Sequence, residues 1–414
     1  MSSIVRIAGV CALASFATLA AAAPQPLLPI TSNDAAARGV VRMLDSYADA
    51  NRPIQALVEP MRRLSEFALT SLASSTTAQA LLTARGGVTV PCPFGGTINA
   101  KLSRNDGHVL KIYWRDCVRL EGQSQPSYTG HSDLTLPSDT LTPTGLEKMR
   151  FGSAAEPFIE TGRFPAQTET DPTVVNTTSW DVQLVGTLPM TRFLNSPFGI
   201  FVGDFEYRLN ASYEQTSRYT YANPDAAPFQ QTNYVSAIDF RASGSTYHTD
   251  ENRVLHEVIN VQRGSFAMAS ESTYQPLQTV QAYELIKLDV NQVLDARNGI
   301  SMLTADGKID YEWPPYLNAT CGNGVYSFNT LIPIRQYDVF HVDGRDQGKV
   351  RINQTAVATF AQGNGPAPPD WYTPIPNERP TTVSVKMGSA GTFTHTSYFP
   401  TSTLPEFMQC PGPN

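Results

Sequence analysis

The side chains that could do chemistry in this 414-residue sequence are few and scattered. Only His248 and His256 lie near enough for a hairpin, turning at about 250–252, to bring two histidines together. With Asp250 or Glu257 as a third ligand they would form a metal site, because histidine is the commonest metal ligand. The alternative is a pair of exposed histidines on a polar hairpin. We adopt this alternative and predict no metal site.

Catalytic motifs are incomplete wherever they begin. The stretch His256–Asn260 opens like a zinc-protease motif but lacks the second histidine. Gly130–Asp133 contains serine-hydrolase residue types in adjacent positions, whereas a triad is built by convergence in space. Asp306–Asp310 lacks the acidic positions of a calcium loop, so we expect a tight turn at Asp306-Gly307. The sequence therefore predicts no catalytic residue and no cofactor.

Four cysteines remain once an N-terminal leader is set aside, and four allow three disulfide connectivities. Residues 96–103 and 108–115 alternate as two strands joined at Asn105-Asp106-Gly107, a hairpin signal that returns the outer ends to each other. We therefore favour one bond at those ends and a second between the remaining pair. A zinc site is the alternative role for these cysteines, but zinc needs ligands spaced a few residues apart, and the cysteines lack that spacing. The predicted pairs are Cys92–Cys117 and Cys321–Cys410.

Residues 1–23 have the parts of a secretory signal peptide. Arg6 precedes an apolar run from Ile7 to Leu19, and alanines follow up to Pro24. The run is shorter than the roughly 20 apolar residues of a membrane-spanning helix. We expect an exported chain in the periplasm, at the outer membrane or outside the cell, without a transmembrane helix in the mature protein.

Composition narrows the class of partner. Charged residues are 16% of the chain, against roughly 25% in an average domain. The net charge of -7 is spread without a basic stripe, so we expect no nucleic-acid partner. Ser, Thr, Tyr, Gly and Pro take the place of the missing charged residues, as is typical of an exported β-rich protein.

Residues 24–87 form the predicted helical N-terminal segment. Residues 33–50 place apolar side chains on one helical face. Pro53 suits the first turn of a second helix, and Pro60 either kinks or restarts it. That second helix carries a stripe of Leu57, Met61, Leu64, Ala68 and Leu72.

Residues 88–363 change to period two and predict a long antiparallel meander, either one curved open sheet or two packed sheets. Gaps of helix length, which parallel strands require, are missing from the pattern. Residues 364–380 are a Pro-rich linker or covering loop, and 381–414 hold C-terminal strands that close on the β region. Predicted strands include 202–213, 216–222, 233–242, 253–260, 264–270, 278–289 and 348–359.

The opening Cys92-Pro-Phe-Gly-Gly, the hairpin to Cys117 and the later Cys321-Gly-Asn-Gly-Val-Tyr resemble a family of exported proteobacterial proteins of uncharacterised role. The resemblance covers the chain from about residue 90 onward. It implies serial strand-turn-strand units and carries no activity with it.

These observations favour an exported, non-enzymatic β-sheet protein that binds an unknown envelope ligand or partner through its sheet surface. Aromatic clusters at Trp313–Tyr316 and Trp371–Tyr372 could stack on sugars, lipid or protein, or could simply pack. One rival is a carbohydrate-active hydrolase that uses two carboxyl groups in a groove. Another is an outer-membrane β-barrel, although strands carrying Arg208, Asp239 and Arg241 fit an apolar lipid-facing band poorly.

Overall fold

The computed structural model places most of the predicted helices and strands. The residues it describes are 26–57, 59–73, 87–103, 108–119, 126–136, 148–152, 156, 158–163, 172–183, 191–192, 201–221, 227, 229–249, 254–295, 298–312, 323–337, 345–362 and 381–397.

Two α-helices precede the strands in this described part. They are α2 (Asn33–Leu57) and α3 (Glu59–Ala73). The backbone oxygen and the side chain of Ser32 accept hydrogen bonds from the first turn of α2, so Ser32 caps that helix. The predicted break at Pro53 is wrong, because α2 continues through it and the second helix begins beside Pro60. Neither helix is long and apolar enough to cross a membrane.

The strands form an antiparallel meander, as predicted. Each strand pairs with the next along the chain, except that β5 and β6 both lie between β4 and β7, and β8 pairs only with the start of β9. No pairing joins β1 to β18 among the described residues, so the sheet is open. The strands are β1 (Val88–Pro91), β2 (Thr97–Ser103), β3 (Val109–Val118), β4 (Ser127–Thr135), β5 (Lys148–Phe151), β6 (Phe158–Arg163), β7 (Pro172–Gln183), β8 (Thr191–Arg192), β9 (Phe201–Tyr221), β10 (Phe229–Thr249), β11 (Val254–Ser272), β12 (Gln275–Asp295), β13 (Ile300–Glu312), β14 (Gly324–Tyr337), β15 (Arg345–Ile352), β16 (Ala356–Gln362), β17 (Thr381–Lys386) and β18 (Thr392–Ser397).

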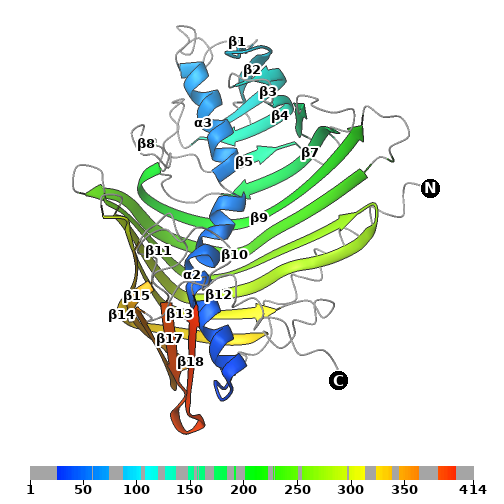
Figure 1. Cartoon of the computed structure of the whole chain (residues 1–414). Helices are drawn as coiled ribbons and strands as arrows, with labels where there is room; N and C mark the ends of the chain where they lie inside the picture. Colours follow the sequence, from blue (N-terminus) through cyan, green and yellow to red (C-terminus); the bar gives the residue numbers. More distant parts are fainter. Residues whose placement is uncertain are drawn as a thin grey trace, which may run out of the picture.

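The sheet curves around the two helices, which follow each other along one of its faces (Figure 1). We call the face that carries α2 the inner face and the opposite one the outer face. Helix α2 contacts β9 to β14 and α3 contacts β5. The core lies between helices and inner face, because the apolar stripes of both helices are buried there, including Val40, Met43, Leu57, Leu64 and Leu72.

Several strands are far longer than the sequence pattern suggested. The predicted strands 202–213 and 216–222 merge into one strand of 21 residues, β9, which is described up to Tyr221, and the predicted break between 260 and 264 lies inside β11. The predicted turn at Asp306-Gly307 is also wrong, since both residues lie within β13. Conversely, the predicted strand 348–359 is divided by a tight turn at Asn353 and Gln354, which have φ values of 48° and 64°.

β-Bulges explain how the long strands bend without ending. Three non-glycine residues within strands adopt a left-handed conformation, with φ between 45° and 49°, and a glycine packs closely against the backbone at or next to each of them. A bulge increases local twist and bends the strand. Gly96 lies against the backbone of Asp116, Gly264 against Phe240 next to Asp239, and Gly307 against the backbone of Lys287.

The bulge at Gly307 is bridged by side chains. A Cβ atom added to Gly307 would overlap the backbone oxygen of Lys287, so only glycine allows this approach. The register between β13 and β14 skips here, and the Asp306 carboxylate accepts a hydrogen bond from the Thr330 backbone nitrogen over 2.8 Å. The Thr330 hydroxyl bonds both backbone groups of Ala305. These bonds replace ladder bonds that the bulge removes, so the strand continues.

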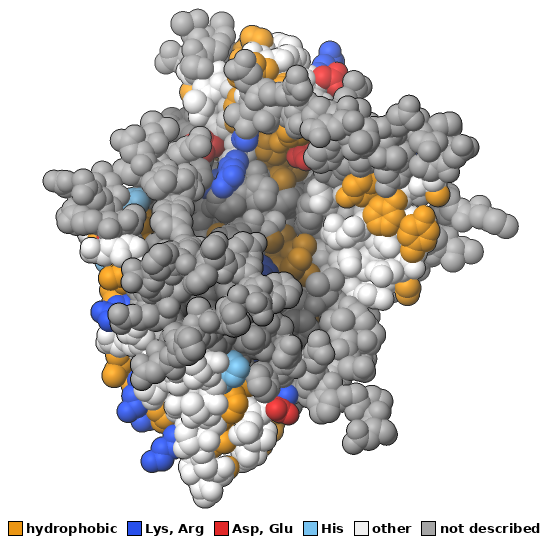
Figure 2. Space-filling view, viewed as in Figure 1, with side chains coloured by type: hydrophobic (Ala, Val, Ile, Leu, Met, Phe, Trp, Pro, Cys, Tyr) orange, Lys and Arg blue, Asp and Glu red, His pale blue; other side chains and the backbone are white. Residues whose placement is uncertain are grey.

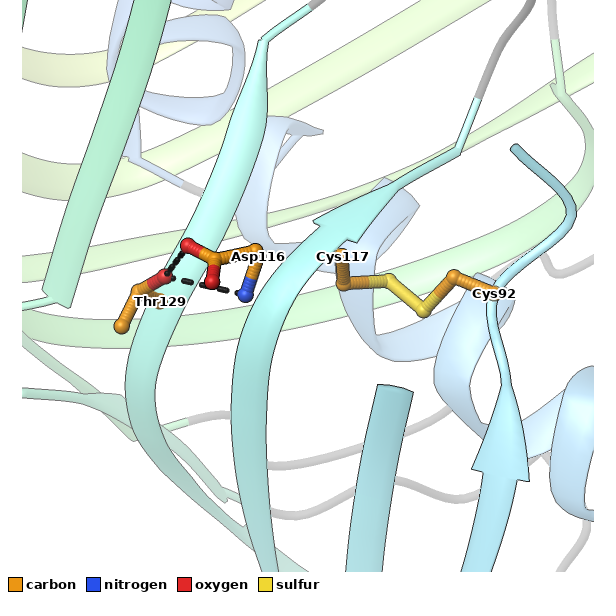
Figure 3. Close-up of a disulfide and its surroundings, with 4 residues drawn as sticks. All are labelled: Cys92, Asp116, Cys117 and Thr129. Atoms are coloured by element: carbon orange, nitrogen blue, oxygen red, sulfur yellow. Dashed lines mark hydrogen bonds between the residues drawn. A yellow bond between two sulfur atoms is a disulfide. The ribbon is translucent and has the colours of Figure 1, made fainter. Parts of the chain in front are cut away.

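The disulfide Cys92–Cys117 forms as predicted, with the two Cα atoms 5.5 Å apart (Figure 3). Strands β2 and β3 pair from Thr97–Arg115 to Ser103–Val109, which returns the two cysteines to each other. The predicted turn at 105–107 lies outside the described residues. At the same end, the Thr129 hydroxyl bonds the backbone nitrogen and the carboxylate of Asp116, over 3.1 and 3.0 Å.

Candidate functional site

The hairpin of β10 and β11 does not bring His248 and His256 together. His248 is paired with Leu255 and His256 with Tyr247, and paired residues share a face. The two imidazoles therefore point to opposite faces of the sheet. The His256 ring stacks on Tyr247 at 4.6 Å, and its Nε2 lies 3.1 Å from the Thr249 hydroxyl. Within the described chain, no group of three potential metal ligands converges.

The serine and the histidine of the Gly130–Asp133 motif contact other residues and not each other. His131 and Ser132 are consecutive on β4 and point to opposite faces, and buried Ser132 accepts a hydrogen bond from Trp114 Nε1 over 2.9 Å. His131 instead lies 3.7 Å from the carboxylate of Glu156. Cys321, Cys410 and the aromatic clusters at 313–316 and 371–372 lie outside the described residues.

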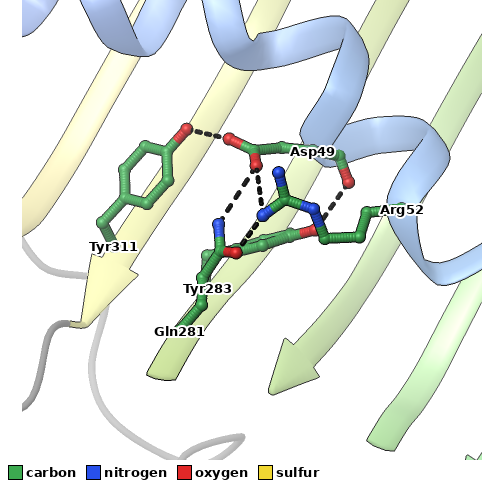
Figure 4. A network of polar contacts seen from close by, with 5 residues as sticks. All are labelled: Asp49, Arg52, Gln281, Tyr283 and Tyr311. Carbon is green, nitrogen blue, oxygen red and sulfur yellow. Dashed lines mark hydrogen bonds and ion pairs between the residues drawn. The ribbon is translucent and has the colours of Figure 1, made fainter. Parts of the chain in front are cut away.

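A buried polar network, which we call the Asp49 network, fastens α2 to the inner face (Figure 4). One carboxylate oxygen of Asp49 accepts hydrogen bonds from Tyr311, and the other from Gln281 Nε2 over 3.2 Å. Arg52 lies 3.5 Å from that second oxygen and also donates to the side-chain oxygen of Gln281. Tyr283 donates to the backbone oxygen of Asp49 over 2.7 Å. The network thus joins one helical turn to β12 and β13.

Two further contacts extend the attachment of α2. The Arg42 guanidinium lies 4.0 Å from the centre of the Tyr311 ring, a cation–π geometry. The hydroxyl of Tyr47, also on α2, donates a hydrogen bond to the Glu257 carboxylate on β11 over 2.5 Å. The polar side of α2 is therefore matched to the sheet by specific partners, which fixes its register more sharply than apolar packing alone.

Burial controls the charge of these carboxyl groups. Removal from water raises the pKa of Asp49 to about 6, although the Tyr311 hydroxyl and Arg52 oppose the shift. Burial likewise raises the pKa of Asp45, one turn earlier, although the nearby guanidinium groups of Arg42 and Arg52 act to lower it. Desolvation also raises the pKa of Glu257.

Asp45 and Asp49 lie on the same side of α2, and paired carboxyl groups are the arrangement a glycosidase needs. Asp49, however, is 1% exposed, and both of its carboxylate oxygens already accept hydrogen bonds from Tyr311 and Gln281. Such a group cannot meet a substrate without leaving its partners. We therefore assign the Asp49 network the role of positioning the helix.

A row of three aromatic rings occupies the inner face where the long strands end, away from α2. Tyr219 on β9 and Phe229 on β10 are paired residues, with ring centroids 5.3 Å apart. Tyr274, in the turn between β11 and β12, stacks on Phe229 with centroids 6.0 Å apart and 24° between the ring planes. Tyr274 is 70% exposed. We call Tyr219, Phe229 and Tyr274 the aromatic row.

Register places this row on the inner face. Gln281, which contacts α2, is paired with Met268, and Met268 with Val235. Two-residue steps along β10 from Val235 lead to Phe229, and alternate residues of a strand share a face. The row therefore lies on the same side of the sheet as α2.

The turn that carries Tyr274 is held rigidly. The Ser272 hydroxyl accepts hydrogen bonds from the backbone nitrogens of Tyr274 and Gln275 over 3.3 and 3.1 Å. The Thr273 hydroxyl accepts a hydrogen bond from the backbone nitrogen of Gln230 over 2.9 Å. The backbone nitrogen of Thr273 donates to the backbone oxygen of Gln230, also over 2.9 Å. An exposed aromatic ring is thus presented from a turn that is clamped to the neighbouring strand.

Half-buried neutral polar side chains adjoin the aromatic row on the inner face. Gln231 Nε2 donates to Asn233 Oδ1 over 3.0 Å. Figure 2 shows hydrophobic side chains gathered over the ends of these long strands, with white polar side chains beside them and no Lys, Arg, Asp or Glu among them. The set, which we call the amide patch, is Gln215, Gln231, Asn233, Ser270 and Ser272.

Sequence reasoning found neither the aromatic row nor the Asp49 network, because both join residues that are distant along the chain. Tyr219, Phe229 and Tyr274 look like ordinary strand aromatics until register aligns them. The one local signal in the sequence is Asn223-Pro224-Asp225, a turn motif that predicts pairing of the two strands on either side of it. Comparison of the chain with protein-family models, curated proteins and solved structures gave no match.

Proposed function

We propose that the mature chain is an exported, non-enzymatic protein that binds an envelope ligand or partner through the inner face of its sheet. The signal-like residues 1–23 support export. The bond Cys92–Cys117 agrees with it, because disulfides persist in oxidising compartments.

The observation that carries the proposal is the exposure of Tyr274 on a clamped turn. A tyrosine that is 70% exposed contributes little to the core, yet its turn is ordered by hydrogen bonds that the hydroxyl groups of Ser272 and Thr273 accept from backbone nitrogens. Aromatic rings bury a large area on binding and often anchor interfaces. A rigid turn lowers the entropy that binding would otherwise cost.

Co-sedimentation with isolated cell envelopes of the producing organism tests this proposal. The mature wild-type chain should sediment with the envelopes, and Tyr274→Ala should remain mostly in the supernatant. Tyr247→Ala is the matched control, because Tyr247 is also an exposed tyrosine, at 42%, but lies on the outer face. Equal sedimentation of all three chains, or none by the wild type, would refute the proposed binding surface.

A further inference from the structure

We propose that the aromatic row and the amide patch together bind a neutral polysaccharide chain. This inference rests on the proposed function and names the chemical class of its ligand. A sugar ring offers C–H groups that pack on aromatic faces and hydroxyl groups that bond to amides, so it needs both kinds of side chain together.

The aromatic row suits an extended ligand better than a small molecule. Its rings come from β9, β10 and the turn between β11 and β12, so the row runs across the strands. Successive centroids are 5.3 and 6.0 Å apart, which gives a continuous apolar track rather than a closed pocket. A polymer can occupy such a track with several units at once, and each unit adds contact area.

Hydrogen-bonding groups lie directly beside this track. Gln231 is two residues from Phe229 on the same face, and Asn233 follows two residues later. Amide side chains both donate and accept hydrogen bonds, as hydroxyl groups do. The Gln231–Asn233 bond of 3.0 Å orients these amides before any ligand arrives.

Charge distinguishes the two faces of these strand ends. Arg218 and Glu271 lie on the outer face, where the Tyr234 hydroxyl donates to the Glu271 carboxylate over 2.8 Å. The described side chains of the aromatic row and the amide patch are all uncharged. This composition favours a neutral ligand over an anionic glycan or an anionic membrane surface, which would select Lys or Arg.

The experiment uses the mature wild-type chain and isolated envelopes that are chemically altered before binding. Periodate cleaves the vicinal diols of sugars, organic solvent removes lipids and proteinase removes proteins. We expect periodate to abolish the Tyr274-dependent sedimentation, and lipid extraction and proteinase digestion to leave it in place. Sodium chloride at high concentration should not release the chain, because salt screens only charge interactions.

Affinity adds a quantitative test. Tyr274→Ala should weaken binding to untreated envelopes about tenfold, and Tyr247→Ala should leave it unchanged. Gln231→Leu, which keeps the side-chain volume but removes the amide, should weaken it as well. The folded state of each variant is checked by circular dichroism and thermal melting.

The outcomes separate this inference from the proposed function. Loss of Tyr274-dependent sedimentation after proteinase or lipid extraction, but not after periodate, would overturn the polysaccharide while leaving the binding surface intact. Release by salt would overturn the neutral character of the ligand. Sedimentation that does not depend on Tyr274 in untreated envelopes would overturn both.

Discussion

The hydroxyl of Tyr283 donates a hydrogen bond to the backbone oxygen of Asp49 over 2.7 Å. Pro53 lies four residues after Asp49 and has no N–H, so it leaves this carbonyl without its helical partner. A side chain on β12 thus supplies the donor that proline removes. The same bond explains why α2 continues through Pro53, where the sequence pattern predicted a new helix.

Tyr283→Phe should lower the free energy of unfolding by about 1–3 kcal/mol, because it leaves a buried carbonyl unsatisfied. In a Pro53→Ala background the restored N–H supplies the donor, so the same substitution should cost clearly less. Urea denaturation of the four chains gives the coupling energy. Tyr311→Phe is the control, because its hydroxyl bonds the Asp49 side chain and its cost should be equal in both backgrounds. Zero coupling between positions 53 and 283 would contradict the account.

Gly307→Ala should destabilise the fold by about 1–3 kcal/mol, since the new Cβ would overlap the Lys287 backbone oxygen and φ is 139°. Gly388→Ala is the matched control: its φ is also positive, at 62°, but an added Cβ meets nothing within 4 Å. Thermal melting should place Gly307→Ala well below Gly388→Ala. Equal melting temperatures would argue against the bulge.

The fold class and one disulfide could be predicted from sequence because both depend on local signals. Alternation over β2 and β3 fixed their hairpin, and the hairpin brought Cys92 and Cys117 together. Strand boundaries were predicted less well. Glycine and aspartate commonly mark turns, but at Asp306-Gly307 they mark a bulge inside a strand.

The candidate site could not be predicted, because it depends on register between distant strands. Nothing near Tyr274 in sequence indicates that its ring stacks on Phe229, 45 residues earlier. Likewise, Pro53 suggested a helix start because the compensating Tyr283 lies far along the chain. Long-range partners can reverse what a local residue indicates.

Replacement of Cys92 and Cys117 by serine should lower the free energy of unfolding by about 3 kcal/mol, as the loop-entropy model gives for a sequence separation of 25. Urea denaturation of the double variant measures the change. Reduced wild-type chain should match the variant, which controls for effects of the serines. An unchanged midpoint in both would show that the bond does not support the β2–β3 end.

Asp49→Asn should flatten the pH dependence of stability. Burial raises the pKa of Asp49 from 3.8 to about 6, so the folded chain holds a proton that the unfolded chain has lost between these values. The free energy of unfolding therefore falls as pH rises through this window, and the contribution of Asp49 is greatest below about pH 4. Denaturation at several pH values should show a smaller decline in Asp49→Asn than in wild type.

Asp34→Asn provides the control for this pH series, because Asp34 is an exposed carboxylate in the first turn of the same helix. The decline should persist in this variant, because Asp49 is unchanged in it. A decline of equal size in Asp49→Asn and wild type would mean that Asp49 is not the titrating group.

Hydrogen–deuterium exchange on the mature chain, free and bound to isolated envelopes collected by centrifugation, tests the binding surface most directly. The account predicts slower exchange on binding at the strand ends that carry the aromatic row and the amide patch, within 215–221, 229–233 and 270–278. Exchange at the opposite ends of β10 to β13, around 246–249 and 300–303, should be unchanged. Protection at those opposite ends instead, with none near Tyr274, would contradict the central claim.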